Sequence, residues 1–152
     1  MCFNWPKIPI NMKRATSGLI GNTVMICGGG SGIGTDKCYS LTSEKTILVT
    51  HMSRARVGAA SIVLNDNTLW VTGGYYIHSG HTEYVTMTET IPGPDFPFPA
   101  EWSFYHSLED HAMVAINNSC TMFIGGGYYV QYTYATTFSY LHDKGEWIHG
   151  PK

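Results

Sequence analysis

Apolar runs that end in two glycines occur three times along the chain. The runs are Val24-Met25-Ile26-Cys27, Leu69-Trp70-Val71-Thr72 and Met122-Phe123-Ile124. The glycine pairs that end them are Gly28-Gly29, Gly73-Gly74 and Gly125-Gly126, which begin 45 and then 52 residues apart. Short apolar runs bounded by turn residues are typical of buried strands. Self-similarity at a period of about 50 residues predicts an array of repeated β units.

Each apolar run is expected to be the second of four antiparallel strands. A turn rich in Gly and Asn separates it from a first strand, and two strands follow. The third and fourth strands are predicted at Lys37–Leu41, Thr46–Val49, Thr137–Leu141 and Glu146–Ile148. In the second unit we expect a loop at Tyr75–His81, a strand at Glu83–Thr88 and an outer strand in the proline-rich stretch Ile91–Trp102. The units span residues 14–50, 56–104 and 110–149, and one more outer strand is expected at residues 2–5.

Composition narrows the possible functions. The net charge is −2, and charged residues make up only 13% of the 152 residues. No basic run with interleaved aromatic residues is present, which argues against nucleic-acid binding. No apolar stretch reaches the roughly 20 residues that a membrane span requires. The N-terminus lacks the apolar region of a signal peptide, so we expect a cytoplasmic protein if the chain is complete, and an extracellular one stays possible if a signal lies upstream.

Four cysteines occur, and none of them has the spacing of a zinc motif. Cys27 ends one predicted strand and Cys38 begins the next. Neighbouring antiparallel strands bring opposite Cα atoms to about 5.5 Å, which suits a disulfide. The alternative is that both are ordinary small core residues.

The repeated pattern resembles the kelch repeat over nearly the whole chain. That family combines an apolar strand, a second strand ending in Gly-Gly, a strand with an aromatic residue and a tryptophan about six residues later. The glycine pairs match, Tyr39 and Tyr140 resemble the aromatic residue, and Trp147 matches the tryptophan. Ile47 replaces the tryptophan in the first unit, and in the second unit it is missing or displaced to Trp102.

The resemblance implies that each unit is a four-stranded blade of a β-propeller. Single blades cannot bury both faces, so neighbouring blades stack. Closed propellers have about four to eight blades, whereas three are predicted here. We therefore expect a partial propeller, which either belongs to a longer one or associates to cover its open ends.

Candidate contact residues follow from the same resemblance. Tyr75, Tyr76, Tyr128 and Tyr129 come directly after glycine pairs, where loops emerge on one propeller face. They are expected either to contact a protein partner or to pack between blades. Arg14, Arg54 and Arg56 precede inner strands and are expected either to bind an acidic partner segment or to pair with Asp66, Glu109 or Asp110.

Other candidates for chemistry are weaker. His78 and His81 share a loop but lack a clear third metal ligand. The glycines between Gly28 and Gly34 resemble a phosphate loop, but a β hairpin and not a helix is predicted to follow. His111 has no nucleophile placed with it.

These features predict a non-catalytic protein-interaction module without cofactor or metal, whose partner is another protein or the remaining blades. Two alternatives remain: a fragment of a kelch-repeat enzyme of the galactose oxidase type, or a purely architectural part of a larger propeller.

Overall fold

A computed structural model gives the fold. It describes residues 6–31, 33–64, 67–91, 101–103, 109–117, 120–124, 128–129, 132–133, 137–141, 144 and 146–149. The predicted strand at 2–5, the pair Gly125-Gly126, Asp66 and most of the proline-rich stretch lie outside these residues.

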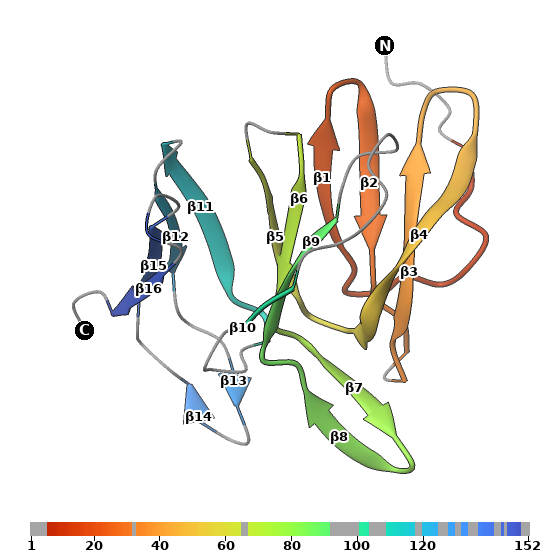
Figure 1. The fold of residues 1–152 in the computed structure, drawn as a ribbon. Coiled ribbons are helices and arrows are strands. Elements are labelled where there is room, and N and C mark those ends of the chain that lie inside the picture. Colours follow the sequence, from red (N-terminus) through yellow and green to blue (C-terminus); the bar gives the residue numbers. More distant parts are fainter. Residues whose placement is uncertain are drawn as a thin grey trace.

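The chain is all-β, as predicted, and its main elements are three four-stranded antiparallel sheets (Figure 1). Sheet I consists of β1 (Thr16–Ile20), β2 (Thr23–Cys27), β3 (Thr35–Leu41) and β4 (Thr46–Arg56), in that order. Sheet II consists of β5 (Ala60–Val63), β6 (Leu69–Thr72), β9 (Met87–Ile91) and β10 (Glu101–Ser103). Sheet III consists of β11 (Ala112–Asn117), β12 (Cys120–Ile124), β15 (Thr137–Leu141) and β16 (Glu146–His149). No helix among the described residues is long and apolar enough to span a membrane.

Two short ribbons are inserted between the second and third strands of sheets II and III. They are β7 (Tyr75–His78) with β8 (His81–Tyr84), and β13 (Tyr128–Tyr129) with β14 (Tyr132–Thr133). The loop expected at Tyr75–His81 is therefore wrong. Ser79 and Gly80 both have positive φ, at 51° and 80°, which is the geometry of a two-residue hairpin turn.

The same hairpin explains the second misplaced element. The third strand of sheet II is β9, whereas the sequence predicted a strand at Glu83–Thr88. Glu83 instead lies in β8, which ends at Tyr84, and the Val85 amide donates to the Gly74 carbonyl at 2.9 Å. The alternating apolar and polar residues of that stretch therefore belong to the end of β8 and the start of β9.

The core lies between sheets I and II. Its buried residues come from the facing surfaces of the two sheets. They are Ile20, Met25, Cys27, Cys38, Met52, Leu69, Val71 and Ile91. Gly18 on β1 makes the close approach possible, because a Cβ at this position would lie 2.6 Å from Leu69 and closer still to Val63. Burial of this apolar surface supplies the main stabilisation of the two-sheet contact.

The first strands of the three sheets are joined in one repeated way. β1 contacts β5, and β5 contacts β11. We call Arg14, Gly58 and Asp110 the pre-strand residues, because each lies two positions before the first strand of its sheet and has positive φ. The Gly58 amide donates to the Arg14 carbonyl at 3.1 Å, and the Asp110 amide donates to the Gly58 carbonyl at 2.8 Å. Each sheet is thus bonded to the next at the same backbone position.

The second glycine of the pair has the same structural role in sheets I and II. A Cβ on Gly29 would lie 2.8 Å from the Ala15 amide nitrogen, and a Cβ on Gly74 would lie 3.1 Å from the Ala59 amide nitrogen. Both glycines have positive φ, which favours glycine. The second glycine of each pair therefore lets the second strand end close to the start of the first strand of its own sheet.

Candidate functional site

One end of the three sheets gathers the candidate residues, and we call it the hairpin end. The connection between β2 and β3 emerges there, together with the β7–β8 and β13–β14 ribbons (Figure 1). Tyr75 and Val57 exchange two backbone hydrogen bonds of 2.7 and 3.0 Å, and the Ile77 amide donates to the Ile33 carbonyl at 3.4 Å. The β7–β8 hairpin is therefore anchored at its base to sheet I and to the link between sheets I and II.

Arg14 connects the three sheets at this end. Its guanidinium donates to Glu109 at 2.9 Å, to Asp110, and to the Tyr75 hydroxyl at 3.0 Å. The guanidinium carbon also lies 5.4 Å from the centre of the Tyr75 ring, within the range of a cation–π contact. Arg14 therefore pairs with the two acidic residues that the sequence offered as the alternative to partner binding.

The electrostatics of this cluster favour the charged form of Arg14. Partial burial lowers the pKa of Arg14, but hydrogen bonds to Glu109 and Asp110 outweigh it and raise the pKa above its ordinary value. One third of the Arg14 side chain and more than half of the Asp110 side chain remain exposed. Exposed pairs contribute little to stability, so the Arg14–Asp110 pair adds little, whereas Glu109, with a side chain only 9% exposed, is a part-buried partner of Arg14.

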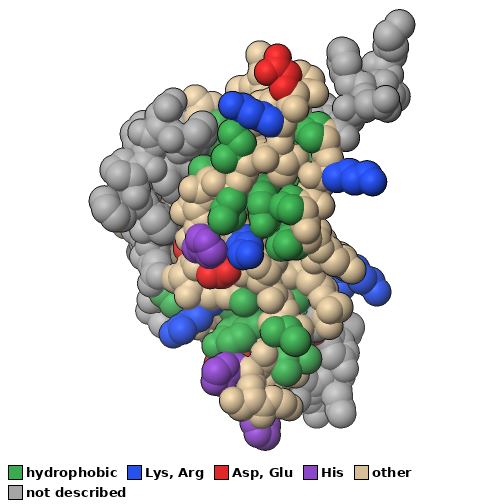
Figure 2. All heavy atoms as spheres, turned by 90° about the vertical axis from the view of Figure 1, so that its right-hand side faces the viewer, with side chains coloured by type: hydrophobic (Ala, Val, Ile, Leu, Met, Phe, Trp, Pro, Cys, Tyr) green, Lys and Arg blue, Asp and Glu red, His purple; other side chains and the backbone are tan. Residues whose placement is uncertain are grey.

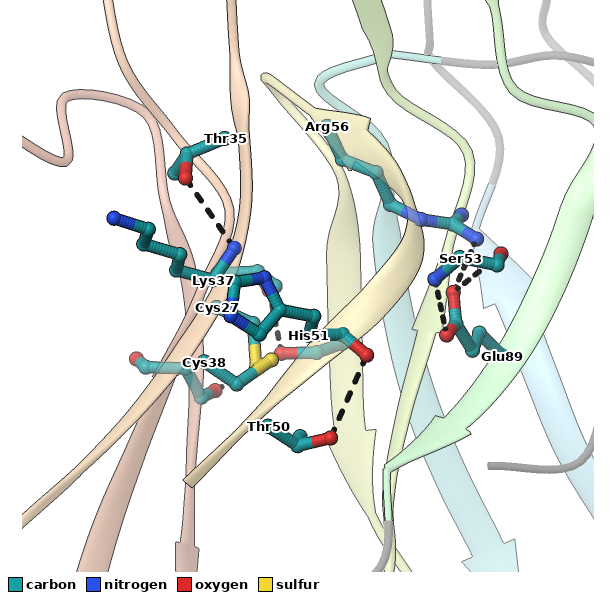
Figure 3. The surroundings of a disulfide bond; sticks show 12 residues. Cys27, Thr35, Lys37, Cys38, Thr50, His51, Ser53, Arg56 and Glu89 are labelled. Atoms are coloured by element: carbon teal, nitrogen blue, oxygen red, sulfur yellow. Dashed lines mark hydrogen bonds and ion pairs between the residues drawn. A yellow bond between two sulfur atoms is a disulfide. The ribbon is translucent and has the colours of Figure 1, made fainter. Parts of the chain in front are cut away.

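Arg56 does not lie where the sequence suggested. It is fully buried, and its guanidinium donates to the Gly73 carbonyl at 3.1 Å, to the Met87 carbonyl at 2.8 Å and to Glu89 at 3.1 Å (Figure 3). Glu89 also accepts from the Ser53 amide at 2.7 Å. Arg56 is therefore an internal link between β4 and sheet II, and the expectation that it contacts a partner is wrong.

The four candidate tyrosines lie in the two ribbons of the hairpin end, β7–β8 and β13–β14. Tyr75 is half-buried against Arg14, whereas the Tyr76 hydroxyl donates to Glu83 across the ribbon. This bond, with smaller effects of desolvation and of the Glu83 charge, raises the pKa of Tyr76. Tyr128 and Tyr129 form β13, in the ribbon that occupies the corresponding place in sheet III.

The tip of the β7–β8 hairpin is exposed. His78 and His81 are paired across the ribbon, and both are exposed. Ile33, whose carbonyl bonds the hairpin, is 71% exposed. Within the part of the chain that the structure describes, no three His, Cys, Asp or Glu side chains gather as a metal site would require.

A disulfide joins Cys27 to Cys38 inside the core of sheet I (Figure 3). The two residues are direct partners on β2 and β3, and their Cα atoms are 4.1 Å apart. That separation is shorter than expected because Gly28 and Lys37 form the adjacent hydrogen-bonded pair, which makes the cysteines a non-hydrogen-bonded pair.

The backbone amides of the glycine loop after β2 form hydrogen bonds within the fold. The amides of Gly28, Gly29 and Gly30 donate to the carbonyls of Lys37, Arg56 and Lys13, at 3.1, 2.6 and 2.8 Å. A phosphate loop needs such amides directed at a ligand. In this structure the three amides bond backbone carbonyls instead.

His111 is buried at the start of sheet III. Burial lowers its pKa to about 4, and the Asp110 charge opposes this only partly. The imidazole is therefore neutral at neutral pH. Sequence reasoning missed Gly58 and Glu89; the constant two-residue spacing before each first strand was a signal for Gly58, whereas nothing in the sequence marked Glu89.

Comparisons with known proteins add information on the fold alone. No protein-family model matches the chain, and no curated protein is detectably similar in sequence. A solved structure described as that of YjhT superposes with a TM-score of 0.76 over 97% of this chain, at 16% identity. The chain spans about half of that protein, 53% of its length. The arrangement of the three sheets is thus one that a longer protein also adopts.

Proposed function

We propose that the chain is a segment of a kelch-type β-propeller that acts as a non-catalytic protein-interaction module through its hairpin end. The order of strands within the three sheets and the glycine pairs that close β2 and β6 support the propeller part of this proposal. So does the likeness in fold to a protein of about twice the length. In this proposal sheets I to III are three consecutive blades.

The exposed β7–β8 hairpin carries the interaction role. Its base is fixed by backbone bonds to Val57 and Ile33, while its tip projects past the ends of the sheets (Figure 1). Tyr76, Ile77 and the exposed Ile33 provide apolar and aromatic area beside His78. Rigidly held aromatic surface with few formal charges is typical of the central part of protein–protein contacts.

Affinity capture with the purified chain tests this role. We compare the wild type with Tyr76→Ala and Ile33→Asp at the hairpin end, and with Lys45→Ala in the turn between β3 and β4 at the opposite end. The proposal predicts that proteins retained by the wild type and by Lys45→Ala are lost with both hairpin-end variants, while all variants keep the wild-type melting temperature. Retention of every captured protein by the hairpin-end variants would favour the purely architectural alternative.

A further inference from the structure

One row of apolar residues on the outer face of sheet I corresponds to a row on the face that sheet II buries against sheet I. Gly18 points toward sheet II, so its neighbours Ser17 and Leu19 point away from it. On this outer face Leu19 pairs with Val24, which pairs with Leu41. In sheet II the corresponding row is Val63, Leu69 and Ile91.

The two corresponding rows differ in burial. Leu69 and Ile91 are 0% exposed because sheet I covers them, whereas Leu19 is 61% exposed. Leu48, on the same outer face, is 42% exposed, while Tyr39 and Leu41 are already covered. Hydrophobic side chains gather in the middle of the surface seen from the side of sheet I (Figure 2). Among the residues that the structure describes, no second sheet packs on this outer face of sheet I.

Sheet III carries a row that corresponds to the face of sheet I in contact with sheet II. In sheet I, the face that contacts sheet II has the row Gly18, Met25, Ser40 and Ile47. In sheet III, the corresponding row is Val114, Met122, Ser139 and Ile148, so three of the four residues are identical in type. By register this row lies on the face directed away from sheet II. Val114, Ile116 and Ile148 are 41%, 52% and 42% exposed.

The backbone hydrogen bonds between the pre-strand residues also repeat from one sheet to the next. The amide of each one bonds the carbonyl of the preceding one, from Gly58 to Arg14 and from Asp110 to Gly58. The next step in this series joins the Arg14 amide of another sheet I to the Asp110 carbonyl. It also brings the positive Arg14 of that copy to the acidic end of sheet III, where the Asp110 side chain is 57% exposed.

We infer that two copies of this chain associate head to tail, with sheet III of each copy packed on sheet I of the other, to close a ring of six sheets. A ring fits the length relation, because the chain covers 53% of the protein whose fold it shares and two copies are about as long as that protein. A contact of this type leaves neither end open once the rotation closes. The inference shares the stacking of blades with the proposed function but does not depend on the interaction role of the hairpin end.

Sedimentation equilibrium of the purified chain tests the inference. A closed ring predicts a mass of twice 16.8 kDa that does not rise further with concentration. Leu19→Asp and Val114→Lys should each give a monomer, because each change places a charge in both contacts of the ring. Ile33→Asp changes a residue that is 71% exposed but lies in the connection between β2 and β3 and on neither sheet face, so this variant should remain a dimer.

Mixing the Leu19→Asp and Val114→Lys variants tests directly whether sheet I of one copy contacts sheet III of the other. One contact of a mixed dimer is then unaltered, and the other places the introduced aspartate of one copy near the introduced lysine of its partner, so the mixture should recover the dimer mass. A monomeric wild type overturns the inference, as does a mass that grows with concentration. Loss of the dimer with Leu19→Asp but not with Val114→Lys also overturns it, because that result indicates a contact between two copies of sheet I. Circular dichroism melting curves establish that each variant is folded.

Discussion

At the scale of single residues, the buried pair of Arg56 and Glu89 is the most consequential contact. Both side chains are 0% exposed, and Glu89 also accepts from Ser53. A buried charge whose partner is removed is strongly destabilising, by about 3–5 kcal/mol, whereas replacement of both partners by apolar residues costs much less. The pair therefore makes the contact between β4 and sheet II specific.

A double-mutant cycle checks this role. Arg56→Met is expected to lower the free energy of unfolding by about 3–5 kcal/mol, since it leaves the Glu89 carboxylate buried without its cation. Arg56→Met combined with Glu89→Met should be less destabilised than the sum of the two single variants. Urea denaturation measures all three, and strictly additive losses would show that the two side chains do not act as a pair.

His111 gives a pH dependence whose sign follows from its burial. Its pKa of about 4 in the folded chain lies below the ordinary value of 6.5, so the unfolded chain binds more protons between these two values. Folding stability then falls as the pH drops from about 6.5 to 4, by on the order of 3 kcal/mol in total. His111→Gln, which does not titrate, should remove this part of the pH dependence in urea denaturation curves. Parallel curves for wild type and variant over that range would contradict the assignment.

At the scale of elements, the second glycine of each pair decides how closely the strands approach. Gly74 and Gly80 have nearly equal φ, at 84° and 80°. A Cβ on Gly74 would lie 2.9 Å from the Val57 carbonyl oxygen, whereas a Cβ on Gly80 would meet nothing within 4 Å. The two glycines therefore separate the cost of the backbone conformation from the cost of crowding.

Alanine substitution at both positions measures that difference. Gly80→Ala should cost about 1–2 kcal/mol, which is typical of a left-handed conformation for an L-residue. Gly74→Ala should cost a further 1–3 kcal/mol or so, because its methyl group also crowds the start of sheet II. Equal losses in thermal or urea unfolding would mean that the glycine pair serves the turn alone and not the close approach.

The sequence predicted where the strands of sheets I and III lie because turn residues separate each apolar strand there, but β4 continues to Arg56, beyond the predicted end at Val49. It failed in sheet II, where Tyr75 to Tyr84 forms a ribbon of its own and shifts the third strand to β9. The site was predicted less well. Arg14 was correctly placed beside possible acidic partners, but the burial of Arg56 depends on Glu89, which lies 33 residues away and carries no local signal.

At the scale of the whole molecule, the same sheet-to-sheet relation recurs along the chain. β1, β5 and β11 contact in sequence, and their pre-strand residues form one continuous series of backbone hydrogen bonds. Such stacking distributes stability over contacts between neighbours. The same relation accounts for the matching rows on the outer faces of sheets I and III.

The hydrogen bonds between pre-strand residues test this relation most directly. Nuclear magnetic resonance can detect the scalar coupling between an amide nitrogen and the carbonyl carbon that accepts its hydrogen bond. The repeated stacking predicts a correlation from the Gly58 nitrogen to the Arg14 carbonyl carbon, and another from the Asp110 nitrogen to the Gly58 carbonyl carbon. Absence of both, in a spectrum that shows the bond from Gly28 to Lys37 within sheet I, would contradict it.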